Sequence, residues 1–149
     1  MTMAYGHWSM GFWLLTFIIL VLLQIIKIHI FMRNFRNYDV WNDGVDFSVH
    51  VYELTEKFPR KELYALCDQL QRASVSIPSN IAEGCSRRSQ NEFAHYLEIS
   101  LGSSYEVETQ MEIALKLKYV TEKQYQSIIE EVQSIEKRLT SLINTVRPE

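Results

Sequence analysis

The chain has 149 residues, of which 47% are hydrophobic and 22% are charged, and its formal net charge is −3. This composition is typical of one globular domain with room for an appendage, and it excludes a disordered chain. Residues 1 to 31 hold Lys27 as their single charged side chain, so the remainder has 14 basic against 18 acidic residues. A mildly acidic domain is not a general polyanion binder, so a nucleic-acid surface would have to be a local basic patch.

The first segment of the chain, residues 1 to 31, is apolar. No residue from Trp8 to Ile26 is charged, and roughly 20 apolar residues suffice to span a bilayer. Basic residues follow the apolar run, which favours an uncleaved anchor in the inner membrane with the rest of the chain in the cytoplasm. The alternative is a mis-assigned start, because Met32 could begin a self-sufficient chain. The sequence therefore predicts an extra N-terminal transmembrane helix only if this segment is genuine.

Residues 32 to 149 are expected to form one all-α domain, because their hydrophobic spacing is helical throughout. The predicted helices cover residues 39–57, 60–84, 89–118 and 121–146. Short links between amphipathic helices favour antiparallel packing. The predicted fold is therefore an up-down-up-down antiparallel four-helix bundle.

The first predicted helix carries one apolar stripe. Trp41, Val45, Val49 and Tyr52 recur at steps of four, four and three residues, which is the spacing of one helical face. Asp39 is a plausible N-cap for this helix. These features favour an amphipathic helix.

Two later helices begin with capping-box patterns. Ser89 is followed three residues later by Glu92, and Thr121 is followed three residues later by Gln124. This arrangement satisfies two otherwise unpaired amides at a helix start. The predicted last helix also keeps an apolar seam with coiled-coil-like spacing.

Pro78 falls inside the apolar pattern of the second predicted helix. Proline removes a backbone donor and crowds the preceding turn at a cost of around 3 kcal/mol, so a kink is expected. Asn80 and Glu83 either contact a partner or satisfy backbone groups that Pro78 frees. The second interpretation is favoured, because an interior proline leaves a carbonyl without its donor. Gly84 is expected to end the helix.

Two stretches go beyond generic helix chemistry. They are residues 74–84, Ser-Val-Ser-Ile-Pro-Ser-Asn-Ile-Ala-Glu-Gly, and the following Arg87-Arg88-Ser89 with Glu92-Phe93. Together they resemble the small four-helix-bundle proteins encoded in intervening sequences of bacterial 23S rRNA genes. Further similar positions are Trp41, Leu63-Tyr64, Leu101-Gly102-Ser103 and Glu106-x-Glu108-Thr109-Gln110. The resemblance extends from about residue 35 to residue 146.

The resemblance implies a compact bundle that assembles into a ring-like homo-oligomer, a pentamer, without catalytic activity. The chain is also similar to the accessory variability protein of diversity-generating retroelements, a related bundle that partners a reverse transcriptase and binds structured RNA through a basic surface. That likeness implies RNA binding here. Two departures stand against it: residues 1 to 31 lie outside the family pattern, and the domain is acidic overall.

The best candidates for phosphate contacts are five basic residues at the two ends and on the body of the second helix. They are Arg60, Lys61, Arg72, Arg87 and Arg88. Guanidinium groups bind phosphate oxygens bidentately and release counterions. The alternative is that these residues serve the fold, since basic residues near a helix C-terminus complement its dipole.

No catalytic group, metal site or cofactor is predicted. The glutamates of the third helix lack the Glu-x-x-His pairs of carboxylate metal bundles. Cys67 and Cys85 form no CxxC pair or zinc pattern and favour a reducing compartment, the cytoplasm. We therefore expect a non-catalytic module that associates with RNA or a ribonucleoprotein. The alternative is a protein-interaction scaffold without nucleic-acid binding, tethered to a membrane if residues 1 to 31 are genuine.

Overall fold

The computed structural model describes residues 10–31, 33–60 and 65–147, and these residues form helices without strands. The expected all-α class is confirmed for this part of the chain. The chain divides into two compact units, residues 1–32 and residues 33–149.

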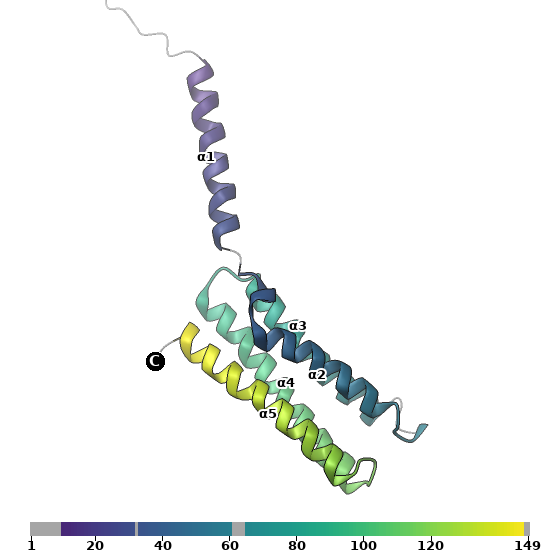
Figure 1. Cartoon of the computed structure of the whole chain (residues 1–149). Coiled ribbons are helices and arrows are strands. Elements are labelled where there is room, and N and C mark those ends of the chain that lie inside the picture. The colour runs from purple at the N-terminus through teal and green to yellow at the C-terminus, as the bar shows by residue number, and fades with distance from the viewer. Residues whose placement is uncertain (1–9, 32, 61–64, 148–149) are drawn as a thin grey trace, which may run out of the picture. The chain divides into compact units, whose positions relative to one another are not determined.

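The described part of the first unit is one helix, α1 (Met10–Phe31) (Figure 1). The side chains of its residues 13 to 24 are all exposed. Over the described residues, no helix is both long enough and apolar enough to cross a membrane. The transmembrane helix expected for this segment is therefore not supported.

The second unit packs four helices around one core (Figure 1). They are α2 (Asp39–Thr55), α3 (Leu66–Cys85), α4 (Gln90–Lys116) and α5 (Glu122–Val146), preceded by the short 3-10 helix η1 (Phe35–Asn37). Each of the four packs against the next, α2 also contacts α5, and η1 contacts α2 and α3. Consecutive helices run in opposite directions. Consequently α2 and α4 run the same way, and no Cα atom of one lies within 8 Å of a Cα atom of the other.

All four helices contribute their inward faces to the core. Phe47, Ile77, Leu97 and Leu139, one from each helix, are among its largest fully buried side chains. Full burial of a side chain of this size stabilises the fold by about 1.5–3 kcal/mol. The apolar seam predicted for the last helix is buried from Ile128 to Leu139. Helical periodicity therefore identified this part of the core correctly.

The two predicted capping boxes are present. Ser89 and Glu92 cap the start of α4, and Thr121 and Gln124 cap the start of α5. The Ser89 hydroxyl accepts from the Glu92 amide at 3.1 Å. The Ser89 hydroxyl and the Ser89 amide both donate to the Glu92 carboxylate, and these hydrogen bonds lower the pKa of Glu92.

Three other predicted helix ends differ from the structure. α2 begins at Asp39 itself, and its N-cap is Tyr38, which makes no side-chain cap. α3 begins at Leu66 rather than at residue 60, and residues 61–64 lie outside the described part. It ends at Cys85, so Gly84 lies inside the helix instead of ending it.

The apolar stripe of the first predicted helix faces away from the core. Val45, Val49 and Tyr52 are 37%, 53% and 46% exposed, and Trp41 is only partly buried. A second set of α2 residues points inward: Val40, Gly44, Phe47, Ser48, Val51, Leu54 and Thr55. Helix α2 is therefore apolar on two faces, and the core of the unit uses one of them.

A polar pair joins α2 to α5 at the surface. His50 Nδ1 lies 2.9 Å from the Glu131 carboxylate. The hydrogen bond and the charge of Glu131 raise the pKa of His50, and the carboxylates of Glu53 and Asp46 add to this effect. The imidazolium form of His50 is therefore favoured by the folded state.

The free energy of unfolding should fall as the pH rises above about 6.5, the ordinary pKa of histidine. The pKa of His50 is higher in the folded chain than in the unfolded chain. Its stabilising contribution is therefore complete when the pH is below the unfolded pKa, and it is lost as the pH rises through the folded pKa. The effect should be small, since the imidazole is 56% exposed. Urea unfolding between about pH 5.5 and 8.5 measures it. His50→Gln and Glu131→Gln should each flatten this slope, and an unchanged slope in both would contradict the pairing.

Candidate functional site

The C-terminal end of α3 and the N-terminal end of α4 meet at one end of the second unit, and the segment before η1 lies against them. Arg33 donates from Nη1 to the Arg87 carbonyl at 2.9 Å and from Nη2 to Gln90 Oε1 at 2.6 Å. Its guanidinium also lies 4.5 Å from the centre of the Phe93 ring. Arg33 therefore fixes the start of the unit to the link between α3 and α4.

Arg87 belongs to a network that spans α3 and α4. It pairs with Glu83 and with the Tyr96 hydroxyl, and its guanidinium lies 4.6 Å from the centre of the Tyr96 ring. The Tyr96 hydroxyl donates to Glu83 at 2.9 Å, and this hydrogen bond raises the pKa of Tyr96. The Arg87 side chain is only 36% exposed. Its contacts therefore serve the packing of α3 on α4.

Two further arginines at this end are exposed. Arg88 lies in the α3–α4 link, and Arg36 lies in η1 with its guanidinium 4.4 Å from the Phe35 ring centre. We call the group Arg33, Arg36, Arg87 and Arg88 the arginine end. The sequence prediction missed the first two residues of this group. Both residues come just before α2 in the sequence. In an antiparallel pair the start of α2 lies beside the end of α3, and this expectation could have placed Arg33 and Arg36 near Arg87.

The remaining predicted basic residues lie elsewhere. Arg72 pairs with Asp68 on the surface of α3 at 3.0 Å. Arg60 is exposed between α2 and α3, at the opposite end of α3 from Arg87. Lys61 lies outside the described residues. Because a helix of 20 residues is about 30 Å long, Arg60 and Arg87 do not belong to one patch.

The carbonyl freed by Pro78 is satisfied from another helix. Pro78 has no N–H to donate to the Ser74 carbonyl one turn earlier. The Ser48 hydroxyl of α2 lies 3.0 Å from Ser74 O and 2.7 Å from Gly44 O. The Gly44 carbonyl has a helical amide donor of its own. The hydroxyl proton is therefore needed at Ser74, and Ser48 connects α2 to the proline turn of α3.

Asn80 and Glu83 take different roles near the proline. Asn80 donates from Nδ2 to the Ser76 carbonyl at 2.8 Å, within the turn that precedes it. It serves the backbone of its own helix, although not the Ser74 carbonyl that Pro78 leaves without an amide donor. Glu83 is instead bound by Arg87 and Tyr96. The expectation that Glu83 serves the backbone was therefore wrong, because its carboxylate binds one partner in the α3–α4 link and one in α4 that the sequence pattern does not reveal.

Gly84 is required by packing. A Cβ at this position would lie 2.8 Å from the Cβ of Tyr96 and 3.0 Å from Cδ2 of Phe93. Both atoms belong to α4, which therefore lies close to the backbone of α3 here. The residue that was expected to end the second helix therefore serves the contact between α3 and α4.

An open apolar groove of about 760 Å³ lies on the outer side of α2 and α3. Its lining residues are Phe35, Trp41, Val45, Ser48, Val49, Tyr52, Glu53, Glu56, Val75, Pro78, Ser79 and Ala82. We call it the α2–α3 groove. The apolar stripe predicted for the first helix lies along it. Large exposed apolar surfaces of this kind mark interaction sites.

The cysteines are placed as core side chains. Cys67 and Cys85 are both buried, and burial raises the pKa of Cys85 to about 11. Over the described residues, no group of three His, Cys, Asp or Glu side chains could hold a metal ion. The candidate sites of the second unit are therefore two surfaces, the arginine end and the α2–α3 groove.

The second unit is therefore a small all-α domain with the arginine end at one end and the apolar α2–α3 groove on its outer side. The sequence pattern of the 23S rRNA-intervening sequence protein family matches residues 36–141. The chain belongs to this family, as its motifs predicted. A search of curated proteins gave no match.

One similar solved structure is a crystal structure at 1.70 Å resolution of a protein with unknown function from the S23 ribosomal protein family of Bacteroides thetaiotaomicron. It is 28% identical, and the match covers 70% of this chain and 95% of that chain with a TM-score of 0.66. The two chains therefore share a fold over almost the whole of the solved protein.

Proposed function

We propose that the chain is a non-catalytic, homo-oligomeric module that associates with RNA or a ribonucleoprotein and is built on an up-down-up-down four-helix bundle. The arginine end is the observation that supports this most. Four guanidinium groups gather there in a domain with more acidic than basic residues. A local basic patch on an acidic surface offers phosphates one favourable place to bind.

The bundle topology is supported by pairs between neighbouring helices. Arg138 of α5 pairs with Asp43 near the start of α2, and Arg147 just after α5 pairs with Glu98 near the start of α4. The end of α5 therefore lies beside the beginnings of both α2 and α4, as antiparallel packing requires. The family resemblance supports a ring of five subunits. Two cysteines without a CxxC pair favour a reducing compartment, the cytoplasm.

The four arginines should contribute unequally to RNA binding. Arg87 is already paired with Glu83, and Arg33 is held by Arg87, Gln90 and Phe93. Arg36 and Arg88 are exposed and can turn toward a phosphate without breaking a contact between helices. We therefore assign the direct phosphate contacts to Arg36 and Arg88.

The full chain should bind a structured RNA hairpin with an affinity that falls log-linearly with salt. Arg36→Ala together with Arg88→Ala should weaken binding at least tenfold and reduce the salt slope by roughly 1.4–1.8, the range for two phosphate contacts. Fluorescence anisotropy of a labelled hairpin measures both quantities.

The matched control is Arg60→Ala together with Arg72→Ala, which removes two arginines and leaves the arginine end intact. This pair should change the affinity little. If both double variants lost the same amount of RNA affinity, binding would depend on overall charge, and the arginine end would not be a specific RNA site. No binding of the unchanged chain at low salt would remove the RNA function.

The α2–α3 groove favours a second candidate, a protein-interaction scaffold without nucleic-acid binding. Its apolar lining is suited to a protein surface and not to phosphates. A chain that self-associates but binds no RNA at low salt would support this alternative.

A further inference from the structure

The outer face of α4 is partly apolar, although it points away from the core. Ile99 and Ile113 are 39% and 44% exposed. With Gly102 and Glu106 between them, they recur at steps of three, four and seven residues, which places all four on one helical face. We call these residues the α4 outer stripe. The buried residues of α4, such as Leu97 and Met111, occupy the opposite face.

Gly102 is the unusual member of this stripe. A glycine inside a helix costs about 1 kcal/mol relative to alanine. A Cβ at residue 102 would meet no heavy atom within 4 Å, so the packing of the described residues gives no reason for glycine here. Gly84 is the opposite case, because α4 leaves no room for a Cβ there. A second chain that approaches α4 closely at Gly102 would supply the reason.

The α2–α3 groove has the shape and the chemistry to receive a helix face. Val49, Tyr52 and Val75 are 53%, 46% and 40% exposed along it. Ridges of side chains on one helix pack into grooves between others. Because no Cα atom of α4 lies within 8 Å of one of α2 and the stripe faces away from the core, one copy cannot place its own α4 outer stripe in its own groove. An α4 outer stripe that occupies the groove must therefore belong to a second copy.

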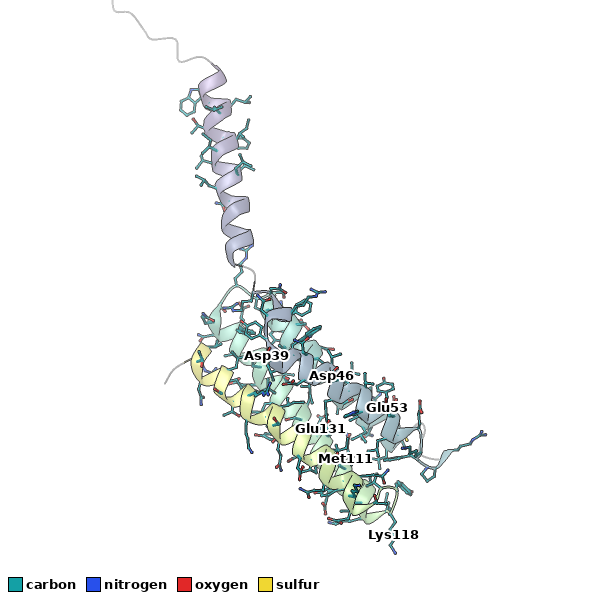
Figure 2. The ribbon with its side chains drawn as sticks, viewed as in Figure 1. Asp39, Asp46, Glu53, Met111, Lys118 and Glu131 are labelled. Atoms are coloured by element: carbon teal, nitrogen blue, oxygen red, sulfur yellow. The ribbon has the colours of Figure 1, made fainter. Side chains whose placement is uncertain are left out.

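The charges at one end of the two surfaces are complementary. Glu53 and Glu56 line the groove near the C-terminal end of α2. Lys116 and Lys118 lie at the C-terminal end of α4, which is the same end of the unit (Figure 2). Lys116 pairs with Glu112 of its own helix at 3.1 Å, but its side chain is 75% exposed and can be shared. Copies placed side by side in one orientation would bring these opposite charges together.

We infer that the α4 outer stripe of one copy docks into the α2–α3 groove of a second copy. This inference rests on the self-association proposed above and assigns its two surfaces. Contact between two different surfaces repeats from copy to copy and forms a ring when it closes. All copies of such a ring share one orientation, so their arginine ends gather on one side. The ring would therefore present repeated basic sites to a single RNA.

Light scattering after gel filtration of the full chain tests the docking. Val49→Glu places a charge in the groove, and Ile113→Glu places one on the stripe. Each change should weaken self-association at least about 30-fold, as expected for a central interface residue, and yield monomers. Both side chains are substantially exposed, so each variant should keep the helical circular dichroism of the unchanged chain. Tyr105→Glu is the control, because this tyrosine is 52% exposed on α4 but lies beside α5 residues, off the stripe.

Mixing the two variants distinguishes this docking from other contacts. The Val49→Glu chain keeps an intact stripe, and the Ile113→Glu chain keeps an intact groove. An equal mixture should therefore form a dimer of one copy of each, whereas a chain with both changes should stay monomeric and rescue neither.

Three outcomes would overturn the inference, and they are distinguishable. A monomeric unchanged chain would remove both the docking and the proposed self-association. If both variants kept the oligomer of the unchanged chain, the docking would be wrong and the self-association would stand. Association through α1 would give this result, because every variant retains α1. Dissociation by Val49→Glu but not by Ile113→Glu would show that the groove meets a different surface.

Discussion

Gly84→Ala should destabilise the second unit by about 1 kcal/mol, the cost of overpacking less the gain in helix propensity. The added Cβ would lie 2.8 Å from the Cβ of Tyr96, an atom that cannot rotate away because it is attached to the backbone. Helix α4 would have to shift from α3, and overpacking of this kind costs about 1–3 kcal/mol. Alanine gains up to about 1 kcal/mol in helix propensity, which offsets part of that cost.

The same substitution at Gly102 is the matched control. Since a Cβ there meets nothing within 4 Å, Gly102→Ala should stabilise an isolated unit by up to about 1 kcal/mol. Urea unfolding of both variants in a Val49→Glu background removes the linkage between folding and assembly. A Gly84→Ala chain as stable as its parent would contradict the close approach of α3 and α4.

Ser48→Ala should cost about 1–3 kcal/mol, the cost of leaving a buried acceptor unsatisfied. Ser48 is 8% exposed, and Ser74, whose carbonyl accepts its hydroxyl proton, is fully buried. Water cannot readily replace the lost donor at this depth. Pro78 cannot supply one either, because it has no N–H. Thermal or urea unfolding measures the loss.

A double-mutant cycle tests the reason for this loss. Pro78→Ala restores an N–H one turn after Ser74, so Ser48→Ala should cost about 1 kcal/mol less in that background. Ser79→Ala is the control. Its exposed hydroxyl donates to the Val75 carbonyl at 2.7 Å, and its loss should change the stability by less than about 0.5 kcal/mol. An equal cost of Ser48→Ala in both backgrounds would show that Ser74 does not depend on the hydroxyl.

These two expectations give the family motif of residues 74–84 a structural meaning. Pro78 and Ser74 connect α3 to Ser48 of α2, while Gly84 and Glu83 connect α3 to α4. The motif therefore fixes three helices relative to one another. The motif also borders the α2–α3 groove, because Pro78, Ser79 and Ala82 are among its lining residues.

The sequence by itself determined the features that depend on near neighbours in the chain. The capping boxes at Ser89 and Thr121 were predicted correctly, because a cap involves only four residues. The apolar seam of α5 was also predicted, because one strongly periodic face leaves no choice of side. The motif around Pro78 was sufficient to identify the family.

Only the tertiary structure decided which apolar face of α2 is buried. The outward face of Val45 and Val49 has helical spacing, as does the inward face of Phe47 and Val51. Periodicity shows that a helix has an apolar face, but it does not show which of two apolar faces turns toward the core. For α2 that depends on the space that α3 and α5 leave open. That choice turned an expected apolar stripe into the lining of a groove.

The arginine end and the role of Gly84 depended on tertiary structure for the same reason. Arg33 and Arg87 are 54 residues apart in the chain and hydrogen-bonded in the fold, whereas Arg72 lies on the surface of α3, where it pairs with Asp68. Gly84 resembled a helix end because glycine is common there, yet the atoms that require it belong to Tyr96 and Phe93 of the next helix. Local propensities fix where helices form and leave open which side chains meet, since close packing between helices sets those contacts.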